Sequence, residues 1–132
     1  MVLVDTNVLV YLLIEGDRTV SAQALYASDP DWRSEAFILV EFSNVLATYV
    51  RTRALSLAKG KELVAEAETI LPALVSFPHK QALEIAAQFG ISAYDARFIG
   101  LAKQLRVKLV TEDARLLAAA PSLTRSLGDA IG

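Results

Sequence analysis

The chain has 132 residues, of which 54% are hydrophobic, and its 13 basic and 15 acidic side chains give a net charge of −2. This length fits one domain spanning residues 1–132, and the apolar content is ample for a core. The lack of cysteine excludes disulfides and thiolate metal sites, and no apolar run reaches the roughly 18 residues that cross a bilayer. Because Asp5 interrupts the first apolar run, a signal peptide is not indicated, and we expect a soluble cytoplasmic protein.

Short apolar runs alternate with segments of helical periodicity along the chain. The first run is rich in valine, which is typical of a buried parallel strand. The expected strands are residues 2–4, 35–37, 73–77, 107–111 and 125–127. The expected helices are residues 8–15, 21–27, 38–53, 56–70, 81–89, 92–105 and 114–120. This alternation predicts an α/β domain with a mainly parallel central sheet of four to five strands and helices on both faces.

Four carboxylates lie inside or at the ends of apolar segments that are far apart in the sequence: Asp5, Glu41, Asp95 and Asp113. A buried carboxylate is costly unless it is paired, hydrogen-bonded or bound to a metal. Converging carboxylates would suit a hard divalent cation, and such ions usually serve phosphate chemistry. Without these four acids the remaining side chains would be mildly basic. The acidic total therefore argues against a basic DNA-reading protein but not against a nucleic-acid substrate.

Two of these acids have equally good structural explanations. Asp5 opens a turn sequence in which it, or Thr6, can cap the helix that follows. Glu41 belongs to a polar stripe that continues through Asn44 to Arg51 at helical spacing. Because the stripe is narrow and its helix is otherwise apolar, it fits a cleft as well as it fits solvent.

The other two acids favour function more strongly. Ser92 can form a capping box with Asp95, but Asp95 also shares a helix face with Phe98. Both roles can hold, because a capping box does not use every carboxylate oxygen. Asp113, like Glu112, can interact with the dipole of the next helix.

Four segments resemble the motifs of PIN-domain ribonucleases, in the order of that family. They are Val2-Leu3-Val4-Asp5-Thr6-Asn7-Val8-Leu9, Glu41-Phe42-Ser43-Asn44-Val45-Leu46, Ser92-Ala93-Tyr94-Asp95-Ala96-Arg97 with Ala102 after it, and Leu109-Val110-Thr111-Glu112-Asp113. Each motif alone is weak, but together they cover nearly the whole chain. The size, with no appended domain, is most similar to VapC-type toxins of toxin–antitoxin pairs.

The resemblance implies a site and a reaction. The catalytic, metal-binding residues would be Asp5, Glu41, Asp95 and Asp113, with Asn7, Asn44 and Thr111 as supporting polar groups. One or two Mg²⁺ or Mn²⁺ ions would activate water and stabilise the leaving oxygen. The implied activity is endonucleolytic hydrolysis of RNA to a 3′-hydroxyl and a 5′-phosphate. The implied partners are an antitoxin protein and a second copy of the chain in a homodimer.

Residues outside the acidic set supply the substrate contacts. Arg97, two residues from Asp95, is the best candidate for binding RNA, although it also fits an ordinary helix surface. Tyr11 and Tyr94 can stack on unpaired bases or pack internally. The only histidine, His79, follows a proline in an expected turn away from every motif, so we expect a surface or capping residue.

Other functions stay open. The same fold can serve a PIN nuclease of RNA maturation or a catalytically silent interaction module. A phosphoacceptor receiver domain needs paired acids after its first strand, whereas Thr6 follows Asp5 here. A haloacid-dehalogenase-like phosphatase needs Asp-x-Asp at this place, and Asn7 occupies the second position. Both of these alternatives therefore fit poorly.

Overall fold

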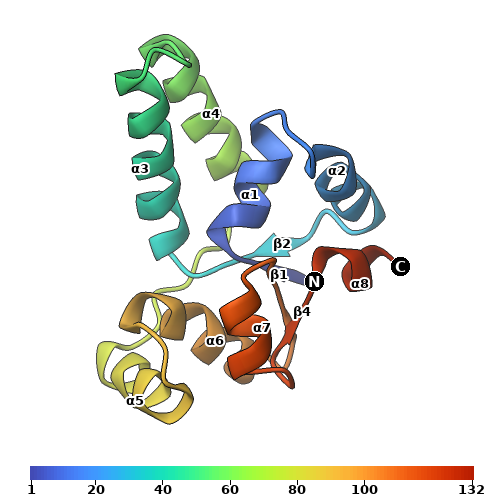
Figure 1. Cartoon of the computed structure of the whole chain (residues 1–132), viewed down its shortest axis with the longest axis vertical. Coiled ribbons are helices and arrows are strands. Elements are labelled where there is room, and N and C mark those ends of the chain that lie inside the picture. Colours follow the sequence, from blue (N-terminus) through green and yellow to red (C-terminus); the bar gives the residue numbers. More distant parts are fainter.

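The computed structural model describes residues 1–132, and a four-stranded parallel sheet forms its centre (Figure 1). The strands are β1 (Val2–Val4), β2 (Trp32–Arg33), β3 (Leu109–Val110) and β4 (Thr124–Arg125), in the spatial order β2-β1-β3-β4. In the two pairings of β1, Val2 lies opposite Trp32 on β2, and Leu3 lies opposite Leu109 on β3. The expected α/β fold with a parallel sheet is confirmed, with four strands.

Eight helices surround this sheet. They are α1 (Thr6–Leu13), α2 (Thr19–Ser28), α3 (Phe37–Arg51), α4 (Leu57–Ile70), α5 (His79–Phe89), α6 (Ala93–Leu105), α7 (Ala114–Ala119) and α8 (Leu127–Ile131). Helices α1 to α4 lie on one side of the sheet and α5 to α7 on the other, while α8 packs beside α2 (Figure 1). None of the helices combines the length and the apolarity needed to cross a membrane.

The strand order places a topological switch point beside β1. The chain passes from β1 to β2 on one edge and later returns to β3 on the other edge of β1. In open α/β sheets, ligands bind outside the carboxyl ends of the two strands at such a point. Asp5 directly follows β1, and Asp113 lies three residues beyond the end of β3.

The core that supports this edge is one continuous cluster of buried apolar side chains from both sides of the sheet. All three residues of β1 are buried, as expected for a strand with neighbours on both edges. Gly100 on α6 allows a close approach, because a Cβ there would clash with the Phe77 ring. The segment before α5 therefore packs tightly against the helix that carries Asp95.

Three expected elements differ from the structure. The second strand is Trp32–Arg33 rather than residues 35–37, and residues 73–77 form no strand. Glu35 and Val75 make only an isolated parallel bridge, because no further backbone pairing extends it. The last strand ends at Arg125, since Ser126 caps the unexpected helix α8 by accepting a hydrogen bond from the Asp129 amide. The apolar pattern could not reveal these long-range pairings.

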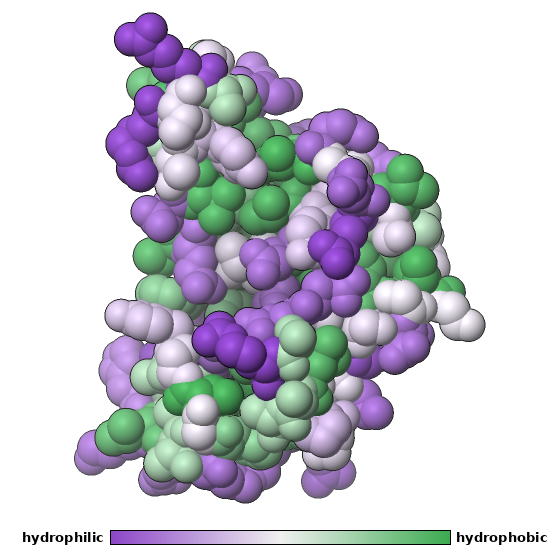
Figure 2. Space-filling view, in the orientation of Figure 1, coloured by the Kyte–Doolittle hydropathy of each residue, from purple (hydrophilic) through white to green (hydrophobic).

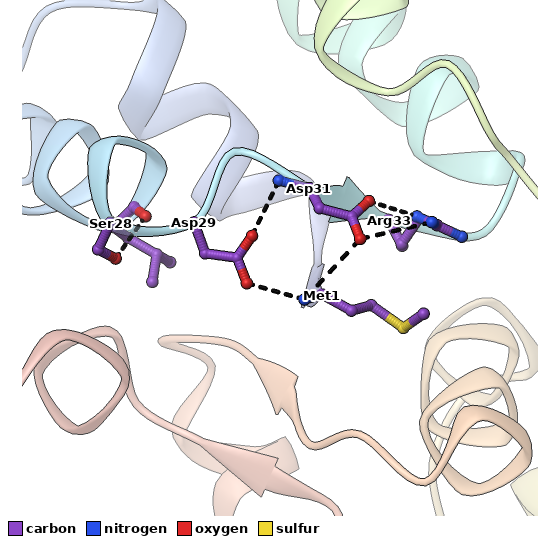
Figure 3. A network of polar contacts seen from close by, with 6 residues as sticks. Met1, Ser28, Asp29, Asp31 and Arg33 are labelled. Carbon is purple, nitrogen blue, oxygen red and sulfur yellow. Dashed lines mark hydrogen bonds and ion pairs between the residues drawn. The ribbon is translucent and has the colours of Figure 1, made fainter.

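The amino ends of β1 and β2 carry a small network of opposite charges (Figure 3). The Met1 ammonium lies 2.8 Å from Asp29 and 3.8 Å from Asp31. Arg33 donates from Nε to Asp31 at 2.7 Å. Elsewhere on the surface, hydrophilic side chains cross the middle of one face in a band, between the helices above and below the sheet (Figure 2).

Candidate functional site

The four carboxylates singled out in the sequence line a single cavity of about 510 Å³. Asp5, Glu41, Asp95 and Asp113 reach it from four different parts of the fold. Its other polar lining residues are Thr6, Asn7 and Asn44, and its apolar lining residues are Phe37, Val40, Val45, Tyr94, Phe98 and Leu116. No lysine, arginine or histidine lines the cavity. The wall therefore combines acidic and neutral oxygens with an apolar border.

Helix starts set the positions of the two aspartates at the strand ends. Asp5 caps α1, with its Oδ1 accepting a hydrogen bond of 3.2 Å from the Val8 amide. Asp113 caps α7 and accepts a bond of 2.9 Å from the Arg115 amide. The capping explanation from the sequence is therefore correct for Asp5, and Asp113 lies at the start of α7, where the sequence placed it beside the helix dipole. Capping does not compete with a site role, because each carboxylate still lines the cavity.

Asp95 and Glu41 come from helices on opposite sides of the sheet. Asp95 lies in the first turn of α6, where the Ser92 hydroxyl accepts a hydrogen bond of 3.0 Å from the backbone N–H of Asp95. Glu41 lies in the second turn of α3, and its Oε1 accepts a hydrogen bond of 2.6 Å from the Thr6 hydroxyl. Because Thr6 directly follows Asp5, this bond ties Glu41 to the end of β1.

Thr111 links the two strand ends. Its hydroxyl is fully buried and donates a hydrogen bond to Asp5 Oδ2. The Thr111 hydroxyl oxygen also accepts a hydrogen bond of 3.0 Å from the Asp113 amide. One side chain from the end of β3 thus orients both acids, which agrees with the supporting role that the sequence resemblance implies.

The pKa of Asp5 is raised to about 6. Burial is the main cause, because the ionised carboxylate loses its hydration. The negative charges of Asp113 and Glu41 add to the rise, while the hydrogen bonds from Thr111 and Val8 oppose it. Asp5 therefore holds a proton through part of the mildly acidic pH range when no cation is nearby.

The same effects act on the neighbouring acids. Burial raises the pKa of Glu41, and the charges of Asp95 and Glu35 raise it further. Burial also raises the pKa of Asp95, with Asp113 adding to the effect and Arg115 opposing it. These mutual repulsions indicate that the acids share one electrostatic environment, in which the exposed Arg115, 3.4 Å from Asp113, is the one basic group in contact with them.

The donor set fits a divalent cation. Carboxylate, amide and hydroxyl oxygens surround the cavity, and these are the ligands that Mg²⁺ and Mn²⁺ prefer. In the present side-chain conformations no three acidic or histidine residues come close enough to enclose an ion. Binding would therefore need small side-chain rotations, or waters to complete the coordination, as is usual for Mg²⁺.

Arg97 has a different place from the one expected. Its guanidinium forms an ion pair with the buried carboxylate of Glu35 and donates to the Phe77 carbonyl at 2.6 Å. It also lies 3.1 Å from Nδ1 of His79, and it is not part of the cavity wall. Arg97 therefore forms an internal ion pair outside the cavity wall, and its contact with RNA stays a prediction that this position does not favour. His79 is exposed as expected, but through Arg97 it contacts the third motif after all.

The sequence reasoning missed Glu35 and Phe37. Glu35 is 1% exposed and also accepts a hydrogen bond of 2.6 Å from the Phe37 amide. Its position beside an apolar run resembled a strand, so its charge drew no attention. Phe37 lines the acidic cavity, although its type and spacing in the sequence indicate only a helix. No local signal distinguishes it from a core residue.

A parallel α/β sheet with acids gathered at its switch point places this chain among the α/β proteins whose ligand site lies at the carboxyl ends of the strands, and comparison with known proteins specifies the family. The model of the PIN domain matches residues 2–121. This chain belongs to the PIN-domain family, whose fold is of the nuclease type. A comparison with curated protein sequences gave no match.

A solved structure supports the fold assignment. The crystal structure of PAE2754 from Pyrobaculum aerophilum is similar over 98% of this chain and 90% of that chain, with a TM-score of 0.80. The sequence identity is 19%, so the likeness concerns the arrangement of helices and strands. It confirms the fold that the four motifs implied.

Proposed function

We propose that this protein is a metal-dependent endoribonuclease whose catalytic and metal-binding residues are Asp5, Glu41, Asp95 and Asp113. The main support is that these acids line one cavity whose wall contains no basic side chain, and that the only basic group in contact with them is the exposed Arg115, 3.4 Å from Asp113. A phosphate group is repelled by such a site unless a cation intervenes. Mg²⁺ or Mn²⁺, as one or two ions, would meet that need.

The chain's own residues have distinct tasks in this proposal. Divalent cations held by the four carboxylates would polarise water for attack on phosphorus and offset charge on the leaving oxygen. Thr111 keeps Asp5 oriented toward the cavity, and Thr6 does the same for Glu41. The apolar border around the acids limits hydration, which strengthens electrostatic interactions inside.

The neutral polar groups complete the site. Asn7 and Asn44 line the same cavity and offer amide groups to a phosphate or to water. Hydrolysis of an RNA phosphodiester by this route needs no covalent intermediate with the protein. The family resemblance implies a 3′-hydroxyl and a 5′-phosphate as the products.

The proposed biological role is the toxin of a type II toxin–antitoxin pair, of the VapC type. The resemblance of the four motifs supports this role, together with a cognate antitoxin and a homodimer as its assembly. The alternatives are an RNA-maturation nuclease and a catalytically silent module. A small reading frame encoding an antitoxin directly upstream, whose product relieves growth arrest on co-expression, separates the toxin from the maturation enzyme.

Cleavage of RNA by the purified protein tests the activity itself. We expect wild-type protein to cut RNA with Mg²⁺ or Mn²⁺ and to stop when a chelator is added. The same reactions with Asp95→Asn should leave the RNA intact. Its matched control is Asp129→Asn, an exposed aspartate on α8 in which the same atoms change outside the cavity. Wild-type protein without any metal-dependent cleavage would favour the silent module.

A further inference from the structure

Two aromatic rings stand at the border of the acidic cavity. Phe37 and Tyr94 stack with ring centroids 5.2 Å apart and an interplanar angle of 13°, within the range that stacked aromatic pairs favour. Both residues line the cavity. Neither belongs to the buried core, and Tyr94 is 62% exposed. The pair thus presents aromatic surface to water beside the carboxylates.

Each ring is carried by a helix that also carries one of the acids. Phe37 begins α3 and precedes Glu41 by four residues, so the two side chains lie on one face of that helix. Tyr94 directly precedes Asp95 in the first turn of α6. The ring stack therefore joins the two helices at the place where their carboxylates enter the cavity.

Two of the other candidates for substrate contact are already engaged. Tyr11 packs against the core, and the Arg18 guanidinium lies 5.4 Å from its ring centroid. Arg97 is held by Glu35. No cationic side chain lines the cavity, although the exposed Arg115 lies 3.4 Å from Asp113 beside it. The apolar and aromatic border is therefore the main part of the wall that can hold a base next to the acids.

We infer that Tyr94, supported from behind by Phe37, is a stacking platform for an unpaired base of the RNA beside the phosphate under attack. This inference rests on the proposed nuclease function and deepens it, because it names the side chains that hold a nucleotide next to the acids. Every base has a π face, so stacking on an aromatic side chain holds unpaired nucleotides with little regard to sequence. A base inside a duplex is already stacked and paired and cannot occupy the platform.

Kinetics with single-stranded oligoadenylate, and with its duplex with oligouridylate, test the platform. Tyr94→Leu keeps apolar surface but removes the π face, so we expect its KM for the single strand to rise about tenfold or more. Its kcat should stay near the wild-type value, and its preference for single strand over duplex should shrink. Tyr94→Phe should behave like wild type. The matched control Leu83→Ala changes a side chain that is 67% exposed on α5 and should change nothing.

Binding measurements make the test independent of cleavage. Fluorescence anisotropy with labelled oligoadenylate in the Asp5→Asn background should show tight binding that Tyr94→Leu weakens. Oligoadenylate with an abasic nucleotide at the cleavage position should bind Asp5→Asn weakly. Adding Tyr94→Leu to Asp5→Asn should weaken the binding of this abasic RNA only slightly, because the Tyr94 ring and the missing base act through the same contact.

The outcomes separate the platform from the nuclease. If wild type cleaves RNA but Tyr94→Leu keeps its KM and its strand preference, the platform is wrong and the nuclease stands. A lower melting temperature for Tyr94→Leu with unchanged KM has the same meaning, since the stack would then be only structural. If nothing cleaves RNA, the nuclease fails, and the anisotropy decides: binding that depends on Tyr94 supports the platform, and binding that does not overturns it.

Discussion

The amino ends and the carboxyl ends of the strands in the sheet hold aspartates in opposite electrostatic surroundings. At the amino ends, Asp29 and Asp31 lie beside the Met1 ammonium and Arg33 in solvent. Hydrogen bonds from that ammonium and from the Asp31 amide hold the pKa of Asp29 below its usual value. At the carboxyl end, Asp5 is buried among other acids and its pKa is raised to about 6. The pKa of an aspartate is therefore lowered at the amino ends of the strands and raised at the carboxyl end.

The difference separates surface structure from a site. Exposed pairs such as Asp31 with Arg33 need nothing more and contribute little to stability. Buried, unmatched acids are a cost that packing elsewhere must offset. They persist where a ligand of opposite charge completes them, which is the reason for assigning function to the carboxyl end.

The largest expected effect is on catalysis. Asp5→Asn removes a negative charge from the cavity, and we expect RNA cleavage to fall by about a hundredfold or more, as when one electrostatic group of an active site is lost. The matched variant Asp31→Asn, at the other end of the sheet, should cleave RNA at the wild-type rate. Initial rates with saturating Mg²⁺ provide the measurement. Equal losses in both variants would abolish the distinction between the two ends.

The next largest effect concerns a buried acid that does have a cation. Arg97→Met leaves the Glu35 carboxylate buried without its partner, and we expect a loss of about 3 kcal/mol of unfolding free energy. Urea denaturation measures the loss, and Glu35→Gln combined with Arg97→Met should recover part of it. Unchanged stability together with weaker, less salt-dependent RNA binding would return Arg97 to the substrate surface.

The raised pKa of Asp5 makes stability depend on pH and metal. Between the ordinary aspartate pKa of 3.8 and about 6 the folded state binds more protons than the unfolded state, so stability falls as pH rises through this window. The shift corresponds to about 3 kcal/mol at most. In chelator at neutral pH, Asp5→Asn should therefore melt at a higher temperature than wild type.

Adding Mg²⁺ should reverse that order. The cation binds the ionised acids of the folded wild type and raises its melting temperature. Asp5→Asn offers one carboxylate fewer, so its melting temperature should rise less. Melting curves across the pH range, with and without Mg²⁺, provide the comparison. A wild-type protein whose stability rises steadily from pH 4 to pH 7 without metal would contradict the assignment of an unmatched acid.

A smaller effect is expected at Thr111. Thr111→Val keeps the shape of this buried side chain but removes the hydrogen bond to Asp5, so we expect cleavage to fall by about ten- to a hundredfold. Thr124→Val is the matched control, because Thr124 is also buried and donates its hydroxyl to the Ala120 carbonyl at 2.8 Å. It should lower stability but leave the cleavage rate intact.

The smallest effect is expected at the amino ends. Arg33→Ala removes a partner from an exposed ion pair with Asp31, and we expect a change in unfolding free energy of about 1 kcal/mol or less. The effect should shrink further at high salt. Thermal melts at two salt concentrations measure it. A larger, salt-independent loss would show that the network at this end carries more than solvent-exposed charge.

Much of the fold could be read from local patterns. The buried run at residues 2–4 and the long amphipathic helices were predicted within a few residues, because hydrophobic periodicity and helix caps are local properties. The strands at residues 35–37 and 73–77 were wrong. Backbone pairing depends on distant neighbours, and a short apolar run does not show whether it has any.

The amino-acid sequence by itself determined which acids stand out and in which order they occur, because an acid beside a buried strand or in a first helical turn is visible in the pattern. Only the tertiary structure decided that Asp5, Glu41, Asp95 and Asp113 line one cavity, that Arg97 is taken up by Glu35, and that Phe37 meets Tyr94. These contacts join segments far apart in the chain. Their geometry follows from how the helices pack on the sheet, which no local propensity encodes.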